Sequence, residues 1–438
     1  MLKVGLYEKD ITPPLGCIIP GYFNARFADD VKDRLYAKAV VFSDGESTVG
    51  LVVMDALLLS AEIHDAICMR VQEYTGIPAS NVNICCTHTH TGIPYAVDHT
   101  NLYPDEEYIS MLKRLAADCV ILAYKRMTDC VVEYGTEIAG EWSFQRTYRM
   151  KDGRMQTAPD NHDPDILCRD GQADHQVAVL VAKNAEGKPL GAMINYACHL
   201  DIVKGNAYSG DFPSIISYEL KKLYGQDFVS MFVNGTCGNL NHVDATKDYP
   251  PSDHYIKMGK ALAQTAVQAM ANARKLQDKQ VACVKKQLIF PTRPFDPREL
   301  EEARHIVATV KEIPGATLAI GGSDPEQVAL VRSKDLLLMY DRMTSETKVW
   351  IQVMKVGDCL LYLLPGEPFV QFGIKIKEKS PVCKNLVIEL SGGGCGYFPL
   401  KELYVPTVFE SQRQSSPYLP GTGEQMVEEI LRLADQLM

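Results

Sequence analysis

Short apolar runs in this sequence are repeatedly followed by a polar side chain that can carry chemistry. Such residues close the runs at Asp55, His88 and His90, His199, residues 234–241, Glu367 and Tyr397. In α/β proteins, ligands bind in the crevice beyond the carboxyl ends of the strands. Because helical runs alternate with the strand-like ones, we expect an α/β fold with a mixed β-sheet core, flanking helices and an active site at the strand carboxyl ends.

The densest of these signals is the stretch 81–94. The alternating apolar residues of 82–86 lead into Thr-His-Thr-His, which contains His88 and His90. Side chains alternate along a strand with a period of two, so we expect both imidazoles on one face, where the strand ends. Two histidines on a core strand are costly unless they are paired or bind a metal. A hydrogen-bonded pair on a partly exposed edge is the structural alternative.

Composition excludes several classes of function. The 438 residues, 46% of them hydrophobic and 23% charged, are ordinary for a soluble globular protein. A net charge of −10 without a basic cluster argues against nucleic-acid binding, and no apolar run is long enough to cross a membrane. The N-terminus lacks the features of a signal peptide, and the thirteen cysteines include no CxxC pair. We therefore expect a cytoplasmic protein with reduced thiols and a small-molecule substrate.

Two segments stand apart from the regular alternation. Residues 141–176 are polar and irregular and include Arg146, which is typical of a lid or binding segment. Residues 296–344 are helical and charged, and Asp296 followed by Pro297 is a helix-start signal. We expect this second segment to be a helical peripheral lobe on a single domain that spans 1–438.

The polar groups at the run ends suit a metal ion. His88, His199 and Glu367 provide two nitrogens and a carboxylate, the ligand set of a catalytic Zn²⁺ with an open position. Tyr397 could add a phenolate, and His90 could carry a proton or bind the substrate. Each residue alone also has a structural interpretation: His199 as a core histidine, Glu367 as a carboxylate at a helix N-terminus, and Tyr397 as a loop aromatic.

Seven short motifs follow one another in a recognisable order. They are DITPPLG at 10–16 with Gly21-Tyr22, THTHTG at 87–92, NYACH at 195–199, SGD at 209–211, GTCGNL at 235–240, LPGEP at 364–368 and GY at 396–397. Together they resemble the catalytic domain of the neutral, non-lysosomal ceramidase family, zinc-dependent amidases that split N-acyl sphingosine. The resemblance covers about residues 10–404, and it implies the ceramidase catalytic-domain fold.

The resemblance also implies roles for individual residues. It implies zinc ligands at His88, His199, Glu367 and Tyr397, and active-site roles for His90 and Arg146. The chain departs from the family at Asn241, where the ceramidases have an essential serine, and at Phe409, where they have a second active-site tyrosine. The C-terminal immunoglobulin-like domain and the secretion signal of the family are not found in this sequence.

We therefore predict a zinc-dependent hydrolase that cleaves the amide bond of a small N-acyl compound other than ceramide. Zn²⁺ would activate water and polarise the carbonyl, and His90 would handle the proton or orient the oxyanion. Arg146 would hold a polar or anionic part of the substrate, and Asn241 would donate a hydrogen bond to it. Phe409 would line the substrate site.

Two other functions fit the sequence. The fold could serve a non-catalytic, metal-containing binding protein, because the family serine is replaced; metal content without hydrolysis would favour it. A hydrolase with Cys237 as nucleophile would be inactivated by iodoacetamide and insensitive to chelators. We rank this hypothesis last, because a buried structural cysteine is the commoner case.

Overall fold

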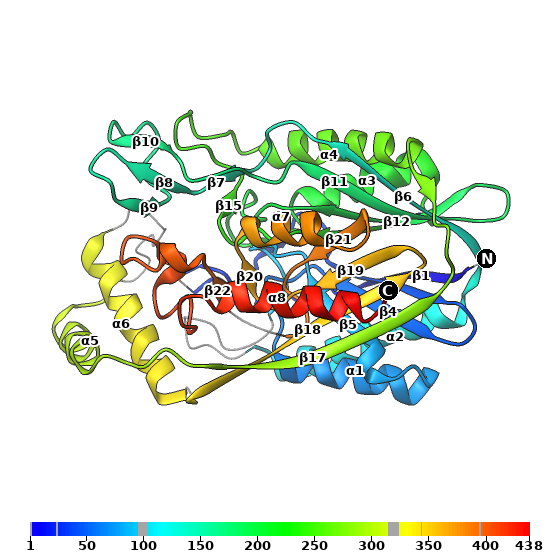
Figure 1. The fold of residues 1–438 in the computed structure, drawn as a ribbon. Helices are drawn as coiled ribbons and strands as arrows, with labels where there is room; N and C mark the ends of the chain where they lie inside the picture. Colours follow the sequence, from blue (N-terminus) through cyan, green and yellow to red (C-terminus); the bar gives the residue numbers. More distant parts are fainter. Residues whose placement is uncertain (1, 23–24, 95–103, 314–323, 343, 394–395) are drawn as a thin grey trace.

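A nine-stranded sheet forms the larger part of the core in this computed structural model, which describes residues 2–438 except 23–24, 95–103, 314–323, 343 and 394–395 (Figure 1). Its strand order is β14-β12-β11-β6-β1-β3-β4-β5, and β16 also pairs with β6. The bounds are β1 Leu2–Asp10, β3 Tyr36–Ser43, β4 Thr48–Met54, β5 Val82–Cys86, β6 Thr128–Ile138, β11 Gln176–Lys183, β12 Pro189–Tyr196, β14 Val229–Asn234 and β16 Arg274–Lys275. The pairs β4–β5 and β12–β14 are parallel and the remaining pairs are antiparallel, so the predicted mixed sheet is confirmed.

Helices cover one face of this sheet. The helices α1 (Ala61–Thr75) and α2 (Glu106–Lys125) pack on the β3–β5 half. The helices α3 (Phe212–Tyr224) and α4 (His254–Ala271) pack on the β11–β14 half. Alternation along the strands sorts the side chains: Val41 and Val52 face the helices, whereas Val40 and Leu51 face the opposite layer.

That opposite layer is a second, four-stranded sheet with the order β17-β18-β19-β21. Its strands are β17 Val281–Pro291, β18 Glu346–Val356, β19 Cys359–Leu363 and β21 Lys384–Ile388. Side chains such as Met354 and Leu361 join the core between the two sheets. The helices α7 (Val370–Lys379) and α8 (Thr422–Asp435) cover the outer face, so the molecule has four layers in the order helix, sheet, sheet, helix.

The segment 141–176 is more regular than the sequence indicates. It contains β7 (Phe144–Gln145) and a small sheet of β8 (Thr147–Met150), β9 (Met155–Thr157) and β10 (Ile166–Arg169) in the order β10-β8-β9. The expectation of an irregular segment is therefore wrong. The strands are too short for a periodic pattern to stand out in the sequence, and Tyr148 and Met150 have a small buried cluster of their own.

Two of the described helices lie within the segment 296–344. They are α5 (Pro297–Thr309) and α6 (Pro325–Arg342), which pack through Leu300, Ala303 and Leu336. As predicted, the Asp296 side chain caps α5 by accepting from the backbone N–H of Arg298. The remaining elements are β2 Asp30–Val31, β13 Ala207–Tyr208, β15 Leu240–Asn241, β20 Glu367–Pro368, β22 Tyr397–Phe398 and the 3₁₀ turns η1 Ala79–Asn81, η2 Lys401–Leu403 and η3 Phe409–Ser411. Among the described helices, none has the length and apolarity needed to cross a membrane.

Candidate metal centre

The predicted metal ligands meet where parallel strands of both sheets end. His88 and His90 follow β5, His199 follows β12, and Glu367 begins β20 shortly after β19 ends. A bridge between Thr89 and Leu200 joins the two histidine loops, and the N–H of His90 donates to the carbonyl of Leu200 over 3.0 Å. The site therefore lies at the strand carboxyl ends, as expected from the positions of these residues in the sequence.

The two histidines of the Thr-His-Thr-His motif come together for a different reason from the one expected. The strand β5 ends at Cys86, so His88 and His90 are not on it. His88 has φ 76, a left-handed conformation that non-glycine residues seldom adopt. The turn leaves the two rings 5.1 Å apart, centroid to centroid. The expectation of strand alternation is wrong, although the expected proximity is present.

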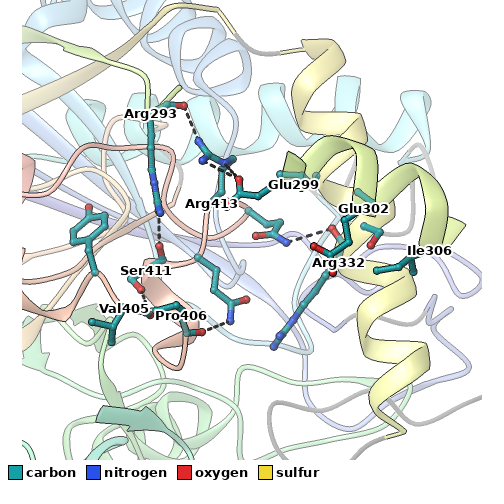
Figure 2. A pocket seen from close by; sticks show the side chains of 15 residues that line it. Arg293, Glu299, Glu302, Ile306, Arg332, Val405, Pro406, Ser411 and Arg413 are labelled. Carbon is teal, nitrogen blue, oxygen red and sulfur yellow. Dashed lines mark hydrogen bonds and ion pairs between the residues drawn. The ribbon is translucent and has the colours of Figure 1, made fainter. Parts of the chain in front are cut away.

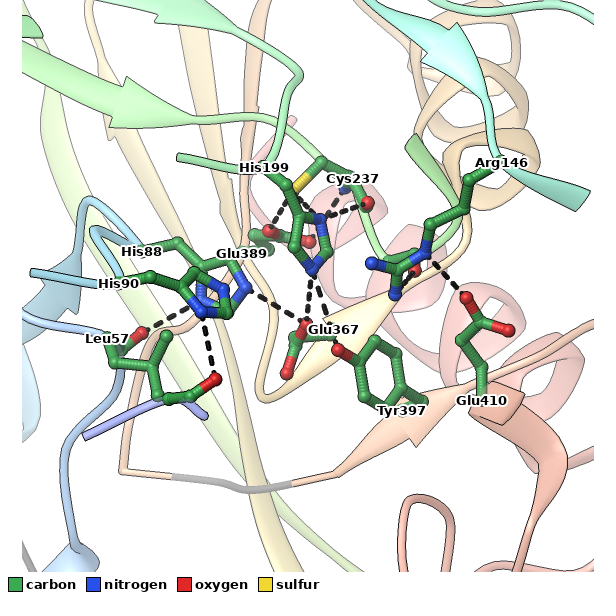
Figure 3. Close-up of polar contacts among 12 residues, drawn as sticks. Leu57, His88, His90, Arg146, His199, Cys237, Glu367, Glu389, Tyr397 and Glu410 are labelled. Carbon is green, nitrogen blue, oxygen red and sulfur yellow. Dashed lines mark hydrogen bonds and ion pairs between the residues drawn. The ribbon is translucent and has the colours of Figure 1, made fainter. Parts of the chain in front are cut away.

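All three histidines hold their rings in the same way (Figure 3). The Nδ1 atoms lie 2.9 Å from the carbonyl of Leu57 for His88, 3.1 Å from that of Gly21 for His90 and 3.0 Å from that of Cys237 for His199. A carbonyl only accepts, so each Nδ1 is the donor, and Nε2 presents a lone pair whenever the imidazole is neutral. Backbone carbonyls orient metal-binding histidines in this way.

Two of these Nε2 atoms, those of His88 and His199, meet a buried carboxylate. Oε2 of Glu367 lies 3.1 Å from Nε2 of His88 and 3.3 Å from Nε2 of His199. Oε2 of Glu367 and Nε2 of His88 and of His90 are buried and form no hydrogen bond of normal geometry with any described residue. Acceptor atoms that face one another out of water repel unless a positive charge lies among them.

The protonation preferences agree with a site for positive charge. Burial alone would lower the pKa of His88, but the charge of Glu367 outweighs it and raises that pKa. Burial raises the pKa of Glu367, and the charge of His88 more than reverses the effect, so the carboxylate stays ionised. Burial and the charge of Arg146 lower the pKa of His199 to about 3, which keeps its ring neutral. His88, His90 and His199 form a group able to hold a metal ion, with ligand atoms within 4.8 Å of one another.

Tyr397 and Arg146 border this group. The strand β22 pairs with β20 so that Tyr397 lies opposite Glu367, and its hydroxyl is 3.5 Å from Nε2 of His199. The guanidinium carbon of Arg146 is 5.5 Å from the centre of the Tyr397 ring. Its Nε donates to Oε1 of Glu410 over 2.6 Å, and a second nitrogen donates to the carbonyl of Gly238 over 2.7 Å. Arg146 is therefore near the candidate ligands, with part of its donor capacity already used.

The two positions that depart from the ceramidase pattern lie on segments that contact the surroundings of Arg146. Asn241 is on β15, which pairs with β7 immediately before Arg146, and its Oδ1 accepts from the backbone N–H of His242 over 2.6 Å. The ring of Phe409 meets that of Tyr397 edge to face, 6.1 Å between centroids. Asn241, Phe409, His90 and Tyr397 are all partly exposed, whereas His88, His199 and Glu367 are buried. The partly exposed residues mark the open side of the site.

Sequence reasoning missed two buried carboxylates. Glu410 holds Arg146, and Glu389 accepts from the backbone N–H of Cys237 over 2.9 Å and from its thiol over 2.9 Å. Glu389 follows the apolar run 386–388, where an ionisable residue is a signal that could have been noticed; Glu410 lies in an irregular segment with no such signal. Burial and the charge of Glu389 raise the pKa of the Cys237 thiol, which disfavours the thiolate that a cysteine nucleophile needs.

The fold is a ceramidase-like α/β fold. The chain superimposes along its whole length on a crystal structure of neutral ceramidase from Pseudomonas aeruginosa, with a TM-score of 0.73, 18% sequence identity and 74% of that chain covered. A structure described as a ceramidase complexed with C2 matches with a TM-score of 0.74, 18% identity and 75% of its chain covered. No family profile and no curated protein sequence matches the chain. The resemblance expected from the motifs is thus confirmed for the fold.

Proposed function

We propose that this protein is a zinc-dependent hydrolase that cleaves the amide bond of a small N-acyl compound. The observation that carries the proposal is the shared orientation of the three histidines. Each donates Nδ1 to a backbone carbonyl, and Nε2 of His88 and of His199 lies 3.1 and 3.3 Å from the carboxylate of Glu367. Neutral imidazoles with a carboxylate and an open side are the ligand set of catalytic zinc, so His88, His199 and Glu367 would hold the ion, with Tyr397 beside them.

The residues around the ion have distinct roles in this proposal. When bound, zinc polarises a carbonyl and lowers the pKa of bound water to about 7. Nε2 of His90 is buried beside the candidate ligands and has no hydrogen-bond partner among the described residues, so in this proposal it accepts a proton from water or donates one to the leaving amine. Arg146 and Asn241 would bind polar groups of the substrate, and Phe409 would contact its apolar part.

The experiment is a metal-dependent activity screen. The protein, purified without added metal, is assayed against short N-acyl amino acids, N-acyl amines and matched esters. Each assay is run as isolated, after chelation and after addition of zinc. We expect hydrolysis of at least one amide, its loss on chelation and its return with zinc. Activity that survives complete removal of metal would contradict the proposal.

Long-chain ceramide is excluded from the proposed substrates. Asn241 and Phe409 replace two hydroxyl side chains that the sequence resemblance expects in ceramidases. Asn241 pairs with the strand β7, which ends just before Arg146, and Phe409 contacts Tyr397. A pocket built to hydrogen-bond a polar group discriminates strongly when that donor or acceptor is removed. We also propose that the protein is cytoplasmic, because its thirteen cysteines include no CxxC pair and no disulfide framework.

One alternative keeps the fold and the metal but not the chemistry. Asn241 cannot act as a nucleophile or general base as a serine hydroxyl can, which favours a metal-containing binding protein without turnover. The same screen separates the two. A protein with a full complement of zinc and no hydrolysis of any amide or ester would support the binding protein.

A further inference from the structure

A cavity lies apart from the candidate metal centre, between the α5–α6 lobe and the segment 404–414 (Figure 2). Its volume is about 340 Å³, enough for a small ligand. Three guanidinium groups line it, those of Arg293, Arg332 and Arg413, together with the carboxylates of Glu299 and Glu302. Arginines from two segments far apart in sequence and from α6 thus line one space.

The three arginines differ in how far their donors are used. Arg413 donates through Nε and one terminal nitrogen to Oε2 of Glu299, over 3.1 and 3.0 Å, and through the other to the carbonyl of Arg293. Arg413 therefore joins α5 to the backbone of Arg293 and has few donors left for a ligand. Arg293 donates from one terminal nitrogen to the carbonyl of Ser411 over 2.8 Å and forms no ion pair with a described residue.

Arg332 is the least satisfied of the three. Its Nε is buried and has no hydrogen-bond partner among the residues that the structure describes. Burial lowers the pKa of Arg332, and burial together with the charge of Arg413 lowers that of Arg293. Partly buried cations without a counter-ion are costly, and an anion in the cavity would remove that cost.

We propose that this cavity binds a small molecule through a carboxylate or phosphate group, which Arg332 and Arg293 hold, and that the bound group braces the segment 404–414. A guanidinium presents a planar fork of donors that matches both kinds of oxyanion. Glu299 is neutralised by Arg413, so the charge available to a ligand is positive on the side of Arg293 and Arg332. Glu302 is exposed and also lines the cavity, so its carboxylate limits the ligand's negative charge.

The bracing follows from what lies on the other side of the same segment. Glu410 accepts from Arg146 over 2.6 Å and from the hydroxyl of Thr157 over 2.6 Å, and Phe409 meets Tyr397. Ser411, the next residue, receives the hydrogen bond from Arg293 on the cavity side. An anion that fixes Arg293 therefore restrains the segment that carries Glu410 and Phe409.

Calorimetric titration of the full-length, zinc-loaded protein tests the binding, with inorganic phosphate and succinate as separate probes at constant ionic strength. We expect saturable binding of at least one probe, and at least about tenfold weaker binding in Arg332→Gln, because a charged hydrogen bond is lost. Arg304→Gln is the matched control, since Arg304 is exposed on α5 and outside the cavity. Absence of saturable binding to both probes would overturn the proposal. Binding that Arg332→Gln leaves unchanged would overturn it too, because the anion would then sit elsewhere, for instance on the zinc ion.

Hydrogen exchange tests the bracing. In the wild type, the bound probe should slow the exchange of amides in 404–414, and this protection should be absent in Arg332→Gln. Saturable binding with unchanged exchange in that segment would refute the bracing. Neither measurement uses hydrolysis, so a failure here is distinguishable from a failure of the proposed amidase activity.

Discussion

Arg146 donates from Nε to Oε1 of Glu410 over 2.6 Å, although 264 residues separate the two in the chain, and both side chains are buried. Burial lowers the pKa of Arg146, but the charge of Glu410 outweighs it and raises that pKa. The second oxygen of Glu410 accepts from Thr157 over 2.6 Å. The pair therefore joins the segment 141–176 to the segment 404–414 beside the candidate metal centre. The ion pair fixes the position of Arg146. Loss of Arg146 would leave the charge of the buried Glu410 unpaired.

Arg146→Ala should impair both stability and activity. Removal of one partner leaves a buried charge unpaired, which costs about 3–5 kcal/mol of unfolding free energy. With a substrate in hand, kcat/KM should fall by roughly one to two orders of magnitude, because a charge-assisted contact is lost. Thermal unfolding and steady-state kinetics measure the two effects.

Arg149→Ala is the control, since that arginine is largely exposed and its nearest carboxylate, Asp170, is 3.9 Å away. Equal effects of the two substitutions would contradict the prediction.

Metal content should depend on the buried ligands. His199→Ala removes a nitrogen ligand and Glu367→Gln removes the carboxylate charge, so each variant should retain far less zinc than the wild type after dialysis. Elemental analysis of the purified proteins gives the stoichiometry, with about one Zn²⁺ per chain expected for the wild type. His305→Ala, on the exposed side of α5, should keep its zinc. Full zinc in both ligand variants would show that the metal site has been assigned wrongly.

Long-chain ceramide should be a poor substrate. We expect kcat/KM for ceramide in detergent micelles to be at least about tenfold below that for the best short N-acyl compound, because the site lacks two hydroxyl side chains. Phe409→Tyr and Asn241→Ser restore these groups singly and together. Improved turnover of ceramide by the double variant would support the argument. Efficient turnover by the wild type would refute it.

Glu389 should make the metal-free protein less stable as pH rises. Burial raises the pKa of Glu389 from 4.5 to about 8. The folded state therefore binds the proton more tightly than the unfolded chain does, so its contribution to stability is complete below pH 4.5 and lost as pH approaches 8. Urea denaturation with a chelator at several pH values should show unfolding free energy falling over this interval, with a shallower fall in Glu389→Gln.

The matched control for this pH series is Glu378→Gln, a substitution on the exposed side of α7. It should follow the wild-type curve. An identical slope in Glu389→Gln would mean that another group gives rise to the pH dependence.

Local sequence determined most of the elements and the kinds of residue at the site. Hairpins such as β11–β12, the helices α1 to α4 and the capped start of α5 follow from periodicity, turn residues and Asp296, because these signals act over a few neighbours. Ligands bind beyond the carboxyl ends of strands, and this rule predicts that His88, His199, Glu367 and Tyr397 lie close together. The N-terminal strand β1 and the last helix α8 were not predicted, although β1 lies in the middle of the larger sheet.

Only the tertiary structure decided how those residues meet. His88 and His90 face one another because His88 is left-handed after β5 ends, and a conformation imposed by the surrounding loops leaves no periodic trace in the sequence. Each histidine's tautomer depends on a carbonyl from a distant segment, such as that of Cys237 for His199. Arg146 and Glu410 pair across 264 positions. Contacts of this kind arise from packing between layers, whereas a sequence pattern reports only the preferences of neighbouring residues.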